Sequence, residues 1–176
     1  DKVAKWTGEK NKYRYNAVYG FDNNGKERSS MTNTYHKPQI SLNHQWQIDY
    51  KSSLSTALYM SIGRGSGHSG QGRTSAYRSM WNGSSNGKLL TNFRKEDGTF
   101  DYGAIQDMNA TSETGSNMVM SKSNNNHMWY GLLSTYTNEL LPGLELSAGV
   151  DMRYYVGKHT NEIIDLYGGE YFIDDT

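Results

Sequence analysis

The chain has 176 residues, with 18 basic and 18 acidic side chains and no cysteine. The charges are scattered without a basic block, which excludes the electrostatic footprint of a nucleic-acid-binding protein, and the lack of thiols excludes disulfides and thiolate metal sites. Fourteen tyrosines and 19 glycines against 2 prolines favour β structure, and no apolar run reaches the roughly twenty residues of a transmembrane helix.

The first predicted element is a strand over residues 12–21, where aromatic residues alternate with polar or small ones. A turn is expected at Asp22–Gly25, because its Asn-Gly pair tolerates the positive φ angles of a tight hairpin. A weaker return strand is expected over residues 28–35. The chain starts at Asp1 with neither an initiating Met nor an apolar leader, so we expect an internal piece of a longer protein.

A long hairpin is predicted over residues 40–62. Its first strand, Ile40–Tyr50, places apolar or aromatic side chains at even positions and polar ones at odd positions. After a turn at residues 51–53, the second strand, Leu54–Ile62, repeats the pattern. The apolar faces of the two strands are therefore expected to align.

Residues 64–126 form a long connection that is rich in Gly, Ser, Asn and Met. Compact soluble domains rarely carry so long a connection unless it binds something or is disordered. A short helix is expected around residues 102–108. The run Gly65–Gly70 matches G-x-G-x-x-G, but no apolar helix follows it, which favours a glycine-rich loop over a dinucleotide site.

A second long hairpin is predicted over residues 128–156, with its turn at residues 138–143. The alternation is cleanest in Leu144–Val156, and the final residues, 160–176, are expected to be a loop or the start of a strand. Runs of about ten alternating residues exceed the ordinary strand of about five or six and match the length that crosses a bilayer at a tilt. Short turns at one end and a long loop at the other are typical of an outer-membrane barrel.

Enzymatic chemistry finds little support. The charged residues of the polar strand faces form either a catalytic dyad or a lumen-facing ion-pair network, and the strand alternation favours the network. These residues are Asp49, Glu145, Asp151 and Arg153. The sequence has no G-x-S-x-G elbow and no histidine pair at metal-binding spacing, so we expect no enzyme, no metal site and no cofactor.

Ligand contacts are expected in the long loop, where aromatic residues and arginines are interleaved. The candidate residues are Arg73, Tyr77, Trp81 and Tyr102. Aromatic faces beside planar hydrogen-bond donors attract sugars, peptides and aromatic chelates. The alternative is that these aromatic side chains pack the loop against its neighbours, and the sequence leaves both interpretations open.

Two blocks of sequence span most of the chain. The first runs through Tyr35–Trp46 and continues, after the turn, through Leu54–Gly65. The second includes Trp129–Ser134, Asp151–Tyr155 and Asp165–Tyr171. Their order and the long loop between them resemble the barrel of Bacteroidetes TonB-dependent outer-membrane receptors.

The resemblance implies an all-β fold: an antiparallel meander of long hairpins, forming part of a 22-stranded transmembrane barrel with a long extracellular loop at about residues 64–126. Residues 1–176 would then be one partial barrel domain in the bacterial outer membrane. The implied partners are outer-membrane lipid, the rest of the barrel and its plug, the TonB complex and an unidentified nutrient or chelate that the receptor imports. No plug segment or TonB-contacting box is recognisable in the chain.

A soluble extracellular module, either an adhesin or a glycan-binding sandwich, is the alternative hypothesis. Such a module explains the tyrosines and the glycine-rich loops, and it uses the same alternation to build a protein core. It requires a second sheet to cover the apolar face. Whether that face is covered distinguishes the two hypotheses.

Overall fold

The structure is a computed structural model that describes residues 2–174. The chain is mostly β with largely antiparallel pairing, which confirms the predicted fold class at this coarse level, and the described residues form no closed barrel. The chain divides into two compact units. We call residues 1–33, 67–123 and 161–176 the loop unit, and residues 34–66 and 124–160 the strand unit.

The loop unit contains short elements around a small core. Its helical segments are α1 (Lys2–Thr7), η1 (Lys12–Arg14), α2 (Ser75–Met80) and α3 (Tyr102–Ala110). Its short strands are β1 (Tyr19–Phe21), β2 (Glu27–Ser29), β6 (Ser84–Ser85), β7 (Lys88–Leu89) and β8 (Phe100–Asp101). β1 lies between β2, to which it is antiparallel, and β8, to which it is parallel. The short helix expected around residues 102–108 is confirmed as α3.

The strand predicted over residues 12–21 is mostly wrong, because only Tyr19–Phe21 is extended. The aromatic residues before it make tertiary contacts instead of lining a strand face. The hydroxyl of Tyr15 donates to the Gly98 carbonyl at 2.6 Å, and its ring lies 5.7 Å from that of Trp6. The predicted turn is confirmed: Oδ1 of Asp22 accepts from the amides of Asn24 and Lys26, and Gly25 has a φ of +72°.

The core of the loop unit is an aromatic cluster with aliphatic and sulfur neighbours. Its buried members are Trp81, Phe100, Tyr102, Ile105, Met118, Met120 and Tyr167. Phe100 lies 4.9 Å from Tyr102, and Trp81 lies 5.4 Å from Tyr167, between ring centroids. Such ring pairs stabilise beyond the area they bury, so this cluster holds together segments far apart in sequence.

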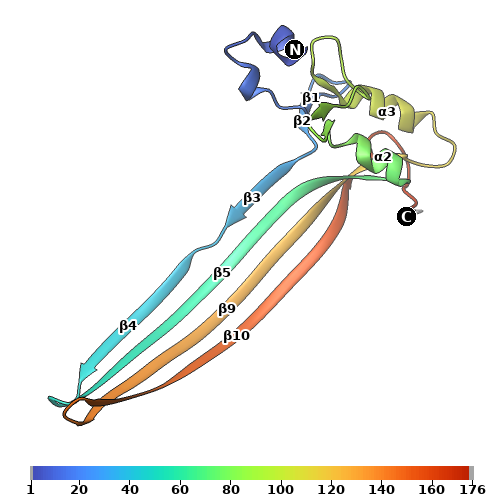
Figure 1. Ribbon diagram of the computed structural model, residues 1–176. Helices are drawn as coiled ribbons and strands as arrows, with labels where there is room; N and C mark the ends of the chain where they lie inside the picture. The colour runs from blue at the N-terminus through green and yellow to red at the C-terminus, as the bar shows by residue number, and fades with distance from the viewer. Residues whose placement is uncertain (1, 175–176) are drawn as a thin grey trace. The chain divides into compact units, whose positions relative to one another are not determined.

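Five strands form the second architectural element. They are β3 (Thr32–His36), β4 (Gln39–Gln47), β5 (Ser52–Gly72), β9 (Met118–Leu141) and β10 (Leu144–Asp165). The order is β10-β9-β5-β3, with β4 also paired to β5. In the strand unit, β4, β5, β9 and β10 run side by side (Figure 1). The two predicted long hairpins are therefore present, and β5, β9 and β10 are longer than expected.

The predicted loop limits, 64 and 126, are wrong at both ends. β5 continues to Gly72 and β9 begins at Met118, so the connection comprises residues 73–117. The glycines of the G-x-G-x-x-G run lie in β5 itself. Because two of them, Gly65 and Gly70, have no side chain, aromatic rings can pack against the strand there. A Cβ at Gly65 would lie 2.4 Å from the Tyr35 ring, and one at Gly70 would lie 2.0 Å from the Trp81 ring. At the C-terminal side, β10 extends to Asp165, past the predicted end of the strand.

The turns of both hairpins are tight. β4 ends at Gln47 and Ser53 pairs with it, so the first turn lies at residues 48–51, earlier than the predicted 51–53. Oδ1 of Asp49 causes the shift, because it accepts from the amides of Lys51 and Ser52 at 2.7 and 2.8 Å. The second turn is Pro142-Gly143, the last two residues of the predicted turn at 138–143, because β9 continues through Leu141.

Candidate functional site

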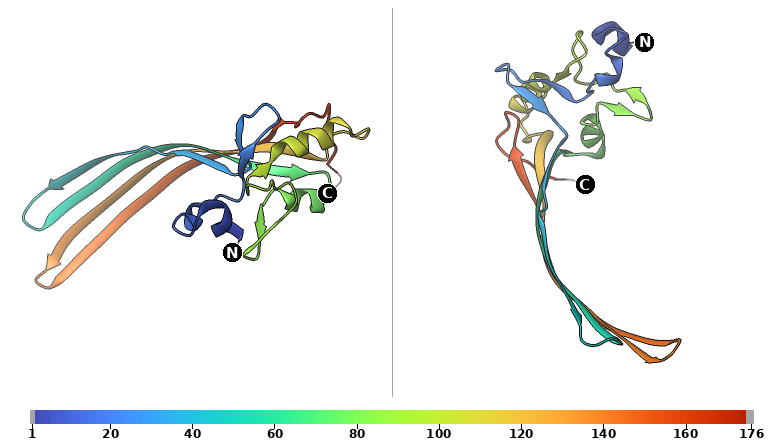
Figure 2. Two further views of the ribbon diagram at one scale, coloured as in Figure 1. Left: turned by 90° about the horizontal axis from the view of Figure 1, so that it is seen from above. Right: turned by 90° about the vertical axis from the view of Figure 1, so that its left-hand side faces the viewer.

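The strand unit is a single layer of strands. Seen nearly edge-on in the right-hand view of Figure 2, its strands overlap as one thin curved sheet. Among residues 34–66 and 124–160, no second sheet or helix lies on either face. Both faces of this sheet therefore need a partner other than these residues, or contact with solvent.

One face is apolar and exposed. The register pairs Ile40 with Met60, Leu42 with Leu58 and Trp46 with Leu54, so the apolar side chains of β4 and β5 share a face, as predicted. On β10, Val150 is 53% exposed and Met152 is 59% exposed. A hollow of about 270 Å³ on this sheet is lined mainly by apolar and aromatic residues. It is lined by Ile40, Leu42, Leu58, Tyr59, Met60, Tyr130 and Gly131. Water is a poor solvent for a continuous surface of this kind.

The apolar face ends at the same level on three strands. On each strand an apolar side chain is followed, two residues closer to the loop-unit end of the strand, by a polar side chain on the same face. The pairs are Ile62 and Arg64 on β5, Met128 and Asn126 on β9, and Val156 and Lys158 on β10. All six residues line one hollow of about 200 Å³, so the three boundaries lie next to one another. The apolar face is therefore a band with a defined edge.

The opposite face is aromatic and charged. Tyr59 and Trp129 pack edge to face at 5.7 Å, and Arg153 pairs with Asp151 at 2.8 Å. Gly131 makes the first pair possible, because a Cβ there would lie 2.0 Å from the Tyr59 ring. These residues, apart from Gly131, line a shallow hollow of about 240 Å³ with Gln39 and Leu133. Of the four charged residues predicted to form a network, Asp151 and Arg153 pair with each other, whereas Asp49 accepts from the turn amides of Lys51 and Ser52.

Two ring nitrogens on this face have no partner among the described residues. They are Nε2 of His127 and Nε1 of Trp129, and both atoms are buried. The His127 ring lies over Gly63 and stacks on Tyr155 at 6.1 Å. A buried polar nitrogen without a hydrogen bond costs stability.

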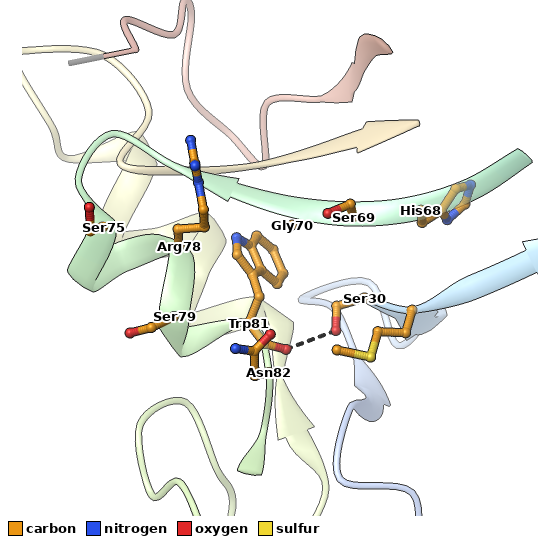
Figure 3. A pocket seen from close by; sticks show the side chains of 10 residues that line it. Ser30, His68, Ser69, Gly70, Ser75, Arg78, Ser79, Trp81 and Asn82 are labelled. Atoms are coloured by element: carbon orange, nitrogen blue, oxygen red, sulfur yellow. Dashed lines mark hydrogen bonds between the residues drawn. The ribbon is translucent and has the colours of Figure 1, made fainter. Parts of the chain in front are cut away.

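The loop unit contains a separate cavity of about 510 Å³, which is within the size range of small-molecule sites. Its lining, shown in Figure 3, is rich in hydroxyl and amide groups. The lining residues are Ser30, Met31, His68, Ser69, Gly70, Ser75, Arg78, Ser79, Trp81 and Asn82. The Ser30 hydroxyl donates to the Trp81 carbonyl at 3.0 Å, and the Trp81 indole N–H donates to the Gln71 carbonyl at 2.8 Å. These bonds fix the wall that α2 and β5 form together.

The four residues predicted to contact ligand do not gather at one site. Only Trp81 lines the cavity, and its side chain is 2% exposed because it also packs in the aromatic core. Tyr102 is fully buried in that core, and Tyr77 packs against its edge. Arg73 donates to the Thr114 hydroxyl at 2.6 Å. The packing alternative therefore accounts for Trp81 and Tyr102.

Burial sets the acidity of the core tyrosines. It raises the pKa of Tyr102 to about 12 and also raises the pKa of Tyr167, despite the nearby positive charge of Arg28. The guanidinium of Arg28 lies 5.6 Å from the Tyr167 ring centroid. Both phenols therefore stay neutral at physiological pH and act as packing groups.

A charge network joins the start and the end of the chain within the loop unit. Nε of Arg28 donates to Asp22 at 2.9 Å, and its Nη1 lies 3.2 Å from Asp165. Burial raises the pKa of Asp22, but the hydrogen bonds from the Lys26 amide, Arg28 and the Asn24 amide outweigh it and hold the pKa below its usual value. No local sequence pattern relates Asp22 to Asp165, so the sequence alone does not predict this network.

The cavity residues Ser30, His68 and Arg78 were also not predictable from the sequence. They come from three separate segments, and isolated serines carry no signal in a chain this rich in serine. The glycine at position 70 was the nearest available hint, since a glycine inside a strand marks a close approach by a neighbour.

Residues 2–174 contain no group of three or more His, Cys, Asp or Glu side chains placed to hold a metal ion. In the same residues, every helix is too short or too polar to span a membrane.

Comparisons with protein-family models, with curated proteins and with solved structures found no match to this chain.

Proposed function

We propose that this chain is part of the wall of an outer-membrane barrel receptor of the TonB-dependent type, which imports a bound nutrient or chelate. The observation that carries the proposal is the uncovered apolar band of the strand unit, whose edge is in register on β5, β9 and β10. The sequence blocks that resemble such receptors lie on the same strands and also support it.

The height of the band supports a bilayer as its partner. From Leu144 to Val156, β10 rises about 40 Å at about 3.3 Å per residue. A tilt of about 45° reduces this to a height of about 28 Å. The hydrocarbon core of a bilayer is about 30 Å thick, so the band has the height that a barrel wall needs.

The opposite face has the composition of a barrel lumen. Charged residues that pair with each other, such as Asp151 and Arg153, are tolerated where water or protein is adjacent and are costly in lipid. In this proposal the remaining strands and a plug complete the barrel.

The loop unit is the ligand-facing part in this proposal. Its cavity of about 510 Å³ offers hydroxyl groups, an amide and the Arg78 guanidinium to a small polar ligand. The cavity therefore replaces the dispersed set of Arg73, Tyr77 and Tyr102 as the place where we expect ligand contacts, and Trp81 remains in it.

The soluble-module alternative requires the apolar band to be covered by protein. Leu42, Val150 and Met152 are each more than half exposed, and no strand-unit residue covers them. This exposure favours the barrel wall over a sandwich.

An arginine scan of β10 in the full-length protein tests the proposal. Val150→Arg places a charge on the apolar face, and Ser147→Arg places one on the face where Ser147 meets Thr137. Val150→Arg is expected to destabilise the membrane-folded protein by about 2–4 kcal/mol. Ser147→Arg is expected to destabilise it by less than about 1 kcal/mol. The measurement is the folded, heat-modifiable fraction in outer membranes. Equal loss in the two variants would contradict the proposed facing.

A further inference from the structure

The edge of the apolar band has a specific chemical form. The hollow of about 200 Å³ is lined by Gly63, His127 and six further residues, of which three are apolar and lie on one side of the boundary and three are polar and lie on the other. The apolar residues are Ile62, Met128 and Val156, and the polar residues are Arg64, Asn126 and Lys158. The hollow is therefore amphipathic, with two cations at its polar end.

Arg64 and Lys158 are exposed, and in residues 2–174 neither has an ion-pair partner. This distinguishes them from the cations of the opposite face, where Arg153 pairs with Asp151 and Lys37 lies over the Trp129 ring at 5.6 Å. Two neighbouring cations without a counter-ion repel each other, and an anion placed between them relieves that repulsion.

We propose that this hollow binds the phosphorylated headgroup of an outer-leaflet lipid. The guanidinium of Arg64 and the ammonium of Lys158 hold the phosphate oxygens, and the Asn126 amide donates a further hydrogen bond. The acyl chains lie over Ile62, Met128 and Val156 and continue along the apolar band. The inference rests on the proposed function, since it needs the band to face lipid.

The apolar half of the hollow argues for lipid over a free anion. Inorganic phosphate contacts only the cations and gains nothing from Ile62 and Val156, which are 38% and 40% exposed. A phosphorylated lipid uses both halves at once. Its headgroup also lies where cations flank a hydrocarbon band, which is where basic side chains attract anionic lipid.

Lipid binding to the full-length protein in detergent tests the site. The variant Arg64→Gln/Lys158→Gln removes both cations, and Lys37→Gln/Arg153→Gln removes two cations from the opposite face as the matched control. Lipid A is the probe, and native mass spectrometry measures the bound fraction. Each cation is expected to strengthen binding about fivefold, so the first variant should bind about 25-fold more weakly and the control about as well as the wild type.

A conservative variant and two further probes complete the test. Arg64→Lys/Lys158→Arg keeps both charges and is expected to retain binding, which excludes a merely structural loss. Phosphatidylcholine should bind both double-glutamine variants and the wild type equally weakly. Equal lipid A binding by the two double-glutamine variants would refute the site, as would displacement of lipid A by inorganic phosphate at equal concentration. The two proposals can fail separately. If lipid A binding refutes the headgroup site while Val150→Arg destabilises the protein more than Ser147→Arg, the barrel proposal still holds.

Discussion

The loop unit buries its largest aromatic side chains, whereas the strand unit leaves most of its apolar side chains at the surface. Trp81, Phe100 and Tyr102 are at most 2% exposed, while Trp46 on β4 is 53% exposed. The same residue types are therefore packed against protein in one unit and exposed in the other. The difference indicates that the loop unit carries a core of its own and that the strand unit depends on its surroundings.

The largest expected effect comes from removing a tryptophan, and it should differ between the two units. Trp81→Ala removes the centre of the aromatic core and should destabilise the loop unit by about 3–5 kcal/mol. Trp46→Ala removes an exposed indole and should leave the loop unit unchanged. Hydrogen exchange of α3 and β8 peptides in the full-length protein measures both variants. Similar protection in the two variants would show that Trp81 is not a core residue.

Asp22→Asn should have the next largest effect, because it removes a buried negative charge that three hydrogen bonds stabilise. The loss should be about 1.5–3 kcal/mol of loop-unit stability at neutral pH. The folded pKa of Asp22 is depressed, so its contribution is complete above the unfolded value of about 3.9 and is lost as the pH falls through the folded value. Acid titration of loop-unit hydrogen exchange checks this. A wild-type and a variant curve of the same slope below pH 5 would contradict it.

Gly70→Ala tests the contact between β5 and the core. A Cβ at this position would lie 2.0 Å from the Trp81 ring, so the ring must move, at a cost of about 1–3 kcal/mol. Ser69→Ala is the matched control, since its backbone neighbours are the same and its side chain is exposed. Trp81 fluorescence and loop-unit hydrogen exchange report the change. An unshifted spectrum for Gly70→Ala would contradict the close approach.

Asp49→Ala should have the smallest effect. Asp49 lies in the strand unit and, like Asp22 in the loop unit, accepts hydrogen bonds from turn amides. The amide of Lys51, with that of Ser52, lowers the pKa of Asp49, but this carboxylate is fully exposed and only caps a turn. We expect faster hydrogen exchange at Lys51 and Ser52 and no change in the loop unit. Loop-unit destabilisation as large as that of Asp22→Asn would show that the two carboxylates have the same role.

Much of the strand unit could be predicted from its sequence. The alternation in Leu144–Val156 and the turn at Pro142-Gly143 specify a strand and its end through local stereochemistry alone. Pairing of Leu42 with Leu58 follows from aligning two such patterns. The first turn was misplaced because the capping bonds of Asp49 shorten β4, which the apolar pattern does not reveal.

The loop unit was less predictable, for reasons visible in its residues. The tyrosines before Phe21 alternate as a strand does, yet Tyr15 bonds to Gly98, far along the chain. Gly67, Gly70 and Gly72 were expected in a loop, yet they are strand positions, and the Trp81 ring lies close to Gly70. Among the candidate ligand residues, Trp81 and Tyr102 are core residues, because an aromatic side chain in a polar segment carries no mark that distinguishes packing from binding.

The sequence by itself determined the two faces of the long hairpins, because side chains in an extended chain must point alternately to opposite sides. It also determined the chemistry available to the chain, which has no thiol and no block of charge. The tertiary structure alone decided which aromatic residues are buried, which glycines admit them, and that Arg28 meets both Asp22 and Asp165. These contacts join residues far apart in sequence, and their formation depends on packing in three dimensions, which no local pattern records.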